Sequence, residues 1–270
     1  FTTFSITSTS SVMSRKRKAA FEVSAATRLP VGTNPYLDYF TESMTSLPPD
    51  ASRLFDPDLD EERRDELDAK VAQVLTEEVC VKYAWAVPDA RALSVIAHFG
   101  PIVEIGAGSG YWSALLRNMG VDVVAADKYT GTGKSKRSSG TSLGESDEGA
   151  WTSVMRAGPE ILKRHSNRAL LLVYPDDFED DSMSMALRCL ENYAGSTVIH
   201  VGEFFGSAKL MEHAWGRSSA DEFQVRLSEL YHKVIEVPLP SWPYSRDSLT
   251  VWKRTSACIT DGGVFGHVPE

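Results

Sequence analysis

Three alternating glycines, placed between two acidic residues, are the feature of the sequence that most directly suggests chemistry. Gly106, Gly108 and Gly110 follow a short apolar segment, precede a helical pattern, and come just after Glu104. Such a loop lets the backbone approach a ligand closely and points the amides of the following helix toward it. Asp127 stands 21 residues after Gly106, at the end of the next apolar segment, where a carboxylate can accept both hydroxyls of a ribose. The pattern predicts a site for a nucleoside-containing cofactor.

Acidic residues that follow two later apolar segments are the candidates for a catalytic base. Asp176 and Asp177 come directly after one predicted strand, and Glu203 after the next. In a doubly wound sheet the carboxyl ends of the strands meet at one edge, and chemistry gathers there. A base is needed only where the substrate must lose a proton. The two aspartates belong to a run of acids that suits a solvated loop better. We predict these three acids as catalytic, with Tyr174 and Trp85 as aromatic walls of a substrate site, although the tryptophan suits a packing role better.

The apolar periodicity predicts the elements that must position these residues. Helices are predicted near 60–78, 90–99, 111–119, 159–165, 183–193 and 222–231, and strands over 102–105, 121–126, around 154, 169–174, 197–201, 234–239 and 249–254. Ser219 and Glu222 have the spacing of a capping box before the last helix. Strands that alternate with helices favour a mostly parallel sheet covered on both faces. The last two strands have no helix between them and should be antiparallel neighbours.

Composition divides the chain into four predicted segments. These are a disordered, basic, Ser/Thr-rich tail at 1–33, an N-terminal helical cap at 34–87, a core domain at 88–255 with a flexible Gly/Ser-rich insertion at 131–149, and a C-terminal tail at 256–270. We expect a cytoplasmic protein. The basic run at 15–18 also suits nuclear import, and the acid-poor tail suits an organelle transit peptide or a plain solvated tail.

The charge of the chain restricts its partners. The 270 residues carry a formal net charge of −9, and no apolar stretch is long enough to span a bilayer. Residues 56–78 hold ten acids and three bases, or −7, and residues 176–181 hold five acids, or −5. Binding to nucleic acid is therefore unexpected, and a neutral or cationic acceptor is favoured over a phosphate-rich one. The sequence does not indicate an oligomeric state.

Three other ligand sites fit the sequence less well. The dinucleotide fingerprint needs a sixth-position glycine where Tyr111 stands. A Gly-Lys-Ser run ends like a phosphate-binding loop, but Lys128 replaces the first glycine of that motif. A calcium loop starting at Asp56 would need glycine and glutamate where Glu61 and Leu67 stand. Three scattered cysteines and unpaired histidines predict no metal site.

The glycine loop, preceded by Glu104, resembles motif I of the class I S-adenosylmethionine-dependent methyltransferases. The resemblance covers about residues 83–254. In segments 83–88, 104–112, 171–177, 201–203, 242–243 and 247–252 the chain looks like a group of methyltransferase-like proteins, a likeness that supplies no substrate. It implies an α/β fold with a doubly wound, mostly parallel seven-stranded sheet, Rossmann-like, whose last strand is antiparallel. It also implies S-adenosylmethionine as the cofactor.

Carried over by position, the resemblance implies roles for individual residues. The cofactor-binding residues would be Glu104, Gly106, Ala107, Gly108, Gly110 and Asp127. Glu104 would contact the amino-acid end of the cofactor, directly or through water, and Asp127 the ribose. Two departures are visible. Residues 157–159 lack the acid that reads the adenine amine in many members, and only Pro175 remains of the Pro-Pro-aromatic motif of amino-methylating members.

The resulting expectation is a methyltransferase that acts on an unidentified small-molecule or protein acceptor. The disrupted motif around Pro175 favours an alternative, a catalytically inactive methyltransferase-like protein that binds or scaffolds. A nicotinamide-dependent oxidoreductase is a third possibility, which Tyr111 opposes.

Overall fold

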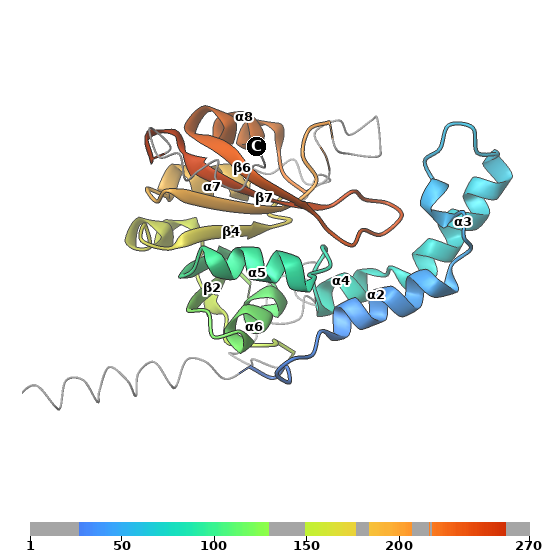
Figure 1. The fold of residues 1–270 in the computed structure, drawn as a ribbon, viewed down its shortest axis with the longest axis horizontal. Helices are drawn as coiled ribbons and strands as arrows, with labels where there is room; N and C mark the ends of the chain where they lie inside the picture. The colour runs from blue at the N-terminus through green and yellow to red at the C-terminus, as the bar shows by residue number, and fades with distance from the viewer. Residues whose placement is uncertain (1–26, 130–148, 177–183, 207–215, 217, 258–270) are drawn as a thin grey trace, which may run out of the picture.

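A computed structural model describes residues 27–129, 149–176, 184–206, 216 and 218–257 of the chain (Figure 1). Its centre is a seven-stranded sheet in the order β3-β2-β1-β4-β5-β7-β6. The strands are β1 (Ile102–Ile105), β2 (Val123–Asp127), β3 (Met155–Arg156), β4 (Ala169–Val173), β5 (Thr197–Gly202), β6 (Tyr231–Pro238) and β7 (Ser248–Arg254). Strands β1 to β5 run parallel to one another, and β7 is antiparallel to both β5 and β6. The predicted fold class and the reversed last strand are confirmed.

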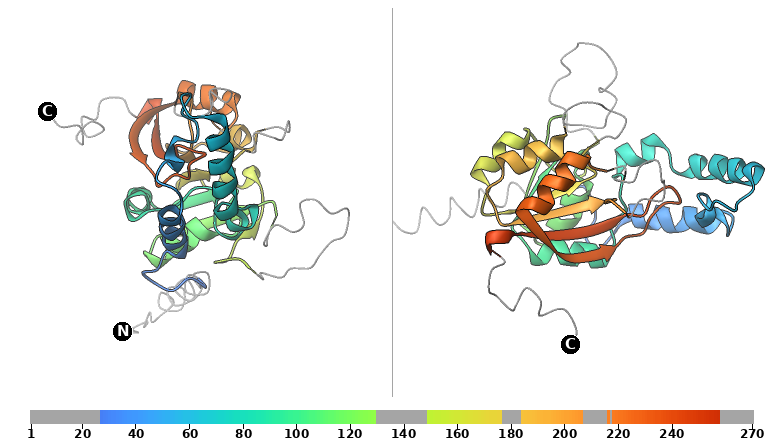
Figure 2. Two further views of the ribbon diagram at one scale, coloured as in Figure 1. Left: turned by 90° about the vertical axis from the view of Figure 1, so that its right-hand side faces the viewer. Right: turned by 90° about the horizontal axis from the view of Figure 1, so that it is seen from above.

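Helices cover both faces of the sheet, as the buried apolar runs of its central strands require (Figures 1 and 2). One face packs against α5 (Ala90–His98) and α6 (Tyr111–Asn118). The other packs against the 3-10 helix η2 (Pro159–Arg164), α7 (Met185–Asn192) and α8 (Asp221–Leu230). β4 is buried along its whole length, between the two layers.

The helices before the sheet form an extension that we call the N-terminal arm (residues 34–87). It consists of α2 (Pro35–Ser46), the 3-10 helix η1 (Ala51–Arg53), α3 (Glu61–Val74) and α4 (Glu77–Lys82). Figures 1 and 2 show the arm projecting from the sheet beside the turn between β6 and β7. Leu47, Leu54, Leu67 and Val71 make a small core within the arm. None of the helices in the described ranges is long and apolar enough to cross a bilayer.

The structure differs from the sequence predictions in a helix break, a helix cap and the extent of the N-terminal tail, besides shifts of a few residues at element ends. The long helix predicted to residue 78 ends at Val74, and Thr76 caps a separate helix, α4, by accepting a hydrogen bond from the Val79 amide. The predicted capping box of α8 does not form, because Ala220 is the N-cap residue. The disordered tail was predicted to reach residue 33, but the described structure begins earlier, at residue 27. Leu29 is buried, and Thr27 pairs with Thr152 in an isolated bridge.

Other predictions lie outside the described residues. They concern residues 1–26, the insertion at 131–148, the acidic stretch 177–181 and the C-terminal segment after 257. The two predicted boundaries of the core domain remain predictions.

Candidate functional site

The glycine loop joins β1 to α6 and is held by backbone hydrogen bonds. The amides of Gly106 and Ala107 both donate to the Ala126 carbonyl of β2, at 2.9 and 3.1 Å. Gly110 is the N-cap residue of α6 and has a left-handed backbone with φ of 74°. The loop therefore lies at the carboxyl ends of β1 and β2, where the sequence predicted a ligand site.

The three glycines are needed for different reasons. A Cβ on Gly106 would lie 2.6 Å from Met185 Cε, and one on Gly110 would lie 2.8 Å from Val154 Cγ2. A Cβ on Gly108 would meet nothing within 4 Å, and this residue is exposed with φ of 53°. Two glycines therefore permit close packing inside the protein, whereas Gly108 faces open space.

Asp127 connects the end of β2 to the glycine loop. Its carboxylate oxygen Oδ2 accepts a hydrogen bond from the Gly108 amide at 2.8 Å, and Oδ1 accepts one from the Tyr129 amide at 2.7 Å. The side chain is half-buried. A carboxylate oxygen has further acceptor capacity beyond one bond, so this group can hold the loop and still accept hydroxyl donors.

Glu104 is the buried acid of the site. It lies on β1 with 2% of its surface exposed, and its Oε2 accepts a hydrogen bond from the Ser113 hydroxyl of α6. Burial raises the pKa of this carboxyl to about 7, while the Ser113 bond and nearby Arg117 act in the opposite direction. The structure brings Glu104, the loop and Asp127 to one edge of the sheet.

Two aromatic residues lie together beyond β4. The rings of Trp85 and Tyr174 are stacked, with centroids 6.4 Å apart and planes 21° apart. Trp85 is 55% exposed, whereas Tyr174 is half-buried and donates its phenol to Asp247 Oδ1 at 2.5 Å. Burial and the neighbouring Asp247 raise the pKa of this phenol well above 10, so it is a donor and not a base at neutral pH.

The predicted catalytic acids are in different environments. Glu203 is 1% exposed, and its Oε1 accepts the Arg246 amide at 2.9 Å. Asp176 accepts three hydrogen bonds, from the hydroxyl of Ser184 and from the amides of Ala186 and Ala220. These bonds join the end of β4 to the starts of α7 and α8. Asp177 lies outside the described residues.

Asp247 contacts the candidate site through Tyr174, and the sequence patterns assigned it no role. It lies in the turn between β6 and β7, which we call the hairpin loop (residues 239–247), and is 2% exposed. The predicted antiparallel pair contained a usable signal. β7 runs against β5, so the turn that precedes β7 must reach the carboxyl edge, together with the ends of β4 and β5.

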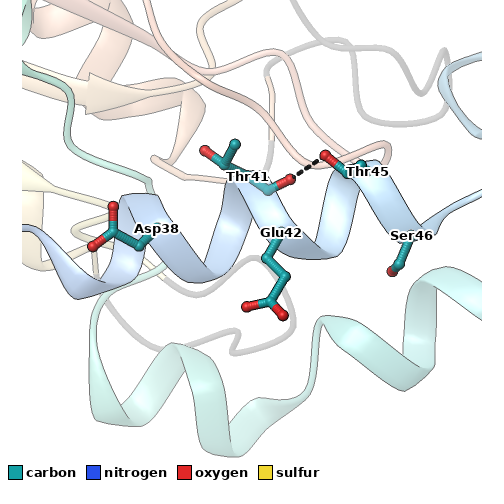
Figure 3. Close-up of a pocket in the computed structure, with 5 residues that line it drawn as sticks. All are labelled: Asp38, Thr41, Glu42, Thr45 and Ser46. Carbon is teal, nitrogen blue, oxygen red and sulfur yellow. Dashed lines mark hydrogen bonds between the residues drawn. The ribbon is translucent and has the colours of Figure 1, made fainter.

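The surface contains a separate shallow hollow of about 490 Å³ along α2 (Figure 3). It is lined by Asp38, Thr41, Glu42, Thr45 and Ser46, and none of these belongs to the glycine loop or the carboxyl edge. Across the described ranges, no three His, Cys, Asp or Glu side chains are grouped so that they could hold a metal ion.

Comparison with known proteins returns likenesses of overall structure alone. No family model and no curated protein matches the chain. The pyocyanin biosynthetic protein PhzM is 18% identical at a TM-score of 0.38, over 76% of this chain and 61% of its own. A 1,6-didemethyltoxoflavin-N1-methyltransferase of Burkholderia thailandensis is 13% identical at a TM-score of 0.39, over 84% of this chain and 92% of its own. The N-methyltransferase NodS of Bradyrhizobium japonicum is 12% identical at a TM-score of 0.33, over 83% of this chain and 100% of its own.

The fold assignment rests on the sheet itself. Its strand order, its parallel β1 to β5 and the reversed β7 inserted between β5 and β6 are the arrangement implied by the glycine-loop resemblance. The protein has the class I methyltransferase fold.

Proposed function

We propose that the protein is an S-adenosylmethionine-dependent methyltransferase acting on a small-molecule or protein acceptor. The observation that carries the proposal is the exposed backbone of Gly108, which has open space above it and lies at the carboxyl edge with Glu104 and Asp127. This arrangement fits the cofactor. The loop has room for a close approach, a carboxylate at the end of β2 suits ribose hydroxyls, and a buried carboxyl suits an ammonium group.

The residues of the site would bind and orient. When bound, the cofactor supplies an electrophilic methyl group on a sulfonium. Asp127 would accept hydrogen bonds from the ribose hydroxyls, and Glu104 would accept hydrogen bonds from the ammonium of the amino-acid end. The aromatic pair Trp85 and Tyr174 would hold the acceptor. In-line displacement depends on alignment at about 3 Å, so positioning alone can supply much of the acceleration.

A base would be needed for an acceptor that must lose a proton, and Glu203 is our first candidate. It is buried at the end of β5, close enough to Tyr174 for its charge to contribute to the raised pKa of that phenol. Asp176 is the weaker candidate, because three donors already bind its carboxylate. Asp177 stays a proposal from the sequence.

One observation favours the second candidate function, a binding or scaffolding module without catalysis. In the segment that follows β4, Asp176 anchors two helices instead of facing an open site. A binding module would retain cofactor affinity and show no methyl transfer to any acceptor. Radiolabelled methyl transfer to fractionated cell extracts, compared with Glu203→Gln, separates the two functions.

The acceptor preference follows from charge. We propose that the protein does not bind nucleic acid, because exposed acids line α3. A cytoplasmic location stays a proposal from the sequence. Neutral or cationic acceptors approach such a surface more readily than phosphate-rich ones.

Calorimetric titration of the purified chain tests the proposal directly. We expect S-adenosylmethionine and its demethylated product S-adenosylhomocysteine to bind with micromolar affinity, on the order expected for enzyme ligands, and NAD not to bind. If neither of the first two binds at millimolar concentration, the proposed function is wrong.

Two glycine variants should separate cofactor binding from stability. Gly108→Ala should reduce S-adenosylmethionine affinity by about tenfold or more and cost about 1 kcal/mol of stability, since its Cβ enters open space at a left-handed φ. Gly110→Ala should cost at least about 2 kcal/mol, because its Cβ would also overlap Val154. Urea unfolding and calorimetry measure both effects. An equal stability loss in the two variants would contradict the assignment of Gly108 to the ligand side.

A further inference from the structure

Tyr174 has an unusual backbone for its residue type. Within the described ranges it is the non-glycine residue with positive φ, at 45°. L-residues with a bulky side chain avoid this region unless their surroundings hold them there, and such residues cluster at functional sites. The contacts of Tyr174 should therefore explain how its conformation is maintained.

The strongest contact comes from the hairpin loop. The Tyr174 phenol donates to Asp247 Oδ1 at 2.5 Å, across 73 residues of sequence. Asp247 is itself fixed. Its Oδ2 accepts the Ser245 hydroxyl at 3.0 Å, and its amide donates to the Ser241 hydroxyl at 2.8 Å. On the outer side the ring stacks with the exposed Trp85. Tyr174 is thus placed between a rigid acceptor and an exposed aromatic ring.

The N-terminal arm holds the hairpin loop from the other side. Trp242 of the loop donates its indole N–H to the Tyr36 hydroxyl at 3.2 Å and packs edge-on against Phe40 of α2. Tyr244 donates to Asp68 Oδ1 of α3 at 2.8 Å. Figure 1 shows α2 and α3 lying beside this turn of the chain. The arm therefore determines where the loop, and with it Asp247, is placed.

We propose that Asp247 is a positioning residue that fixes Tyr174 as a wall of the acceptor site, and that the N-terminal arm holds Asp247 in place through the hairpin loop. The acceptor site itself rests on the proposed function. The phenol stays protonated because burial and the adjacent carboxylate oppose its ionisation, so the bond to Asp247 persists over the neutral pH range. The position of Trp85 reports the arrangement, since its ring stacks on Tyr174.

Fluorine NMR of protein labelled with 5-fluorotryptophan tests the proposal without requiring an acceptor. Trp85→Phe identifies the Trp85 resonance. We expect this resonance to shift or broaden in Asp247→Ala and in Tyr174→Phe, and the double variant to show no further change. Asp247→Asn should keep the wild-type resonance, because an amide oxygen also accepts the phenol proton. Tyr244→Phe, which removes the bond to the arm, should produce a smaller change of the same kind.

Controls distinguish this proposal from the proposed function. Glu229→Ala removes an exposed carboxylate on α8 and should leave the Trp85 resonance unchanged. Calorimetry should find S-adenosylmethionine affinity within about threefold of wild type in Asp247→Ala, a difference under 1 kcal/mol by the logarithmic relation of affinity to free energy. An unchanged Trp85 resonance in both Asp247→Ala and Tyr174→Phe overturns the proposal. If Asp247→Ala does not fold, the other two variants decide. The proposal is then overturned by an unchanged Trp85 resonance in Tyr174→Phe, or by a resonance displaced equally in Tyr174→Phe and Asp247→Asn. Absence of cofactor binding in wild type would overturn the proposed function, and with it the acceptor site, whereas the expected Trp85 shifts would still support the positioning of Tyr174 by Asp247.

Discussion

Asp127→Ala is expected to weaken S-adenosylmethionine binding at least 100-fold. The carboxylate would accept two ribose hydroxyls, and a hydrogen bond to a charged group contributes about 1.5 to 3 kcal/mol. Two such bonds correspond to a factor of about 100 or more at about 1.4 kcal/mol per tenfold. The variant also leaves the amides of Gly108 and Tyr129 without their acceptor, which loosens the loop. Calorimetry against the cofactor and its demethylated product measures the loss.

Asp122 offers a matched control, because it lies next to the opposite end of β2. Its carboxylate pairs with Arg168 at 2.7 Å, far along the strand from the glycine loop. Asp122→Asn should change stability modestly and leave cofactor affinity unaltered. An Asp127→Ala protein that binds the cofactor within threefold of wild type would exclude the ribose role.

Glu104→Gln is expected to stabilise the protein at pH 8 and to weaken cofactor binding. The pKa of Glu104 in the folded chain is raised to about 7 from an ordinary 4.5, so the folded state binds this proton more tightly than the unfolded state does. Stability therefore falls as the pH rises from 4.5 to 7, and the full penalty is present above 7. Removing the ionisable group should recover on the order of 3 kcal/mol at pH 8, at about 1.4 kcal/mol per pKa unit.

Urea unfolding at pH 5 and pH 8 measures this effect. The stability advantage of Glu104→Gln should be large at pH 8 and small at pH 5, where the wild-type carboxyl is largely protonated. Glu160→Gln is the comparison, because this acid has a lowered pKa and is exposed on η2. An advantage that is equal at both pH values would contradict the raised pKa. The loss of cofactor affinity in the same variant would show that a buried charge is kept for binding at a cost in stability.

Much of the fold follows from local patterns in the sequence. Strand β4 is indicated directly by its continuous apolar run, because burial depends on residue type. Helix α6 is indicated by the glycines on either side of it, Gly110 and Gly120, because turn formation also depends on residue type. The division of α3 from α4 was missed. No glycine or proline separates Val74 from Glu77, and only the cap at Thr76 marks the break. A single capping side chain is a weak signal beside a long charged stretch.

The part of the candidate site built from residues close together in the sequence was predictable. The part that depends on pairing between strands far apart in the sequence was not. Glu104, the glycines and Asp127 are arranged by two adjacent strands and one helix. Asp247 and Tyr174 meet across 73 residues, and their contact depends on the placement of β7 between β5 and β6. The left-handed conformation of Tyr174 has no signal in its residue type, since glycine or asparagine is usual there.

The two outer strands of the sheet have a consequence for self-association. An unpaired edge strand can add a strand from another molecule, which leads to aggregation. β3 at one edge is only two residues long. β6 at the other edge contains exposed Lys233 and Glu236, a break in pairing register between Lys233 and Ile235, and a final proline. Among the described residues, short length, charge, an irregular register and a missing amide therefore disfavour the addition of a strand from another molecule at either edge.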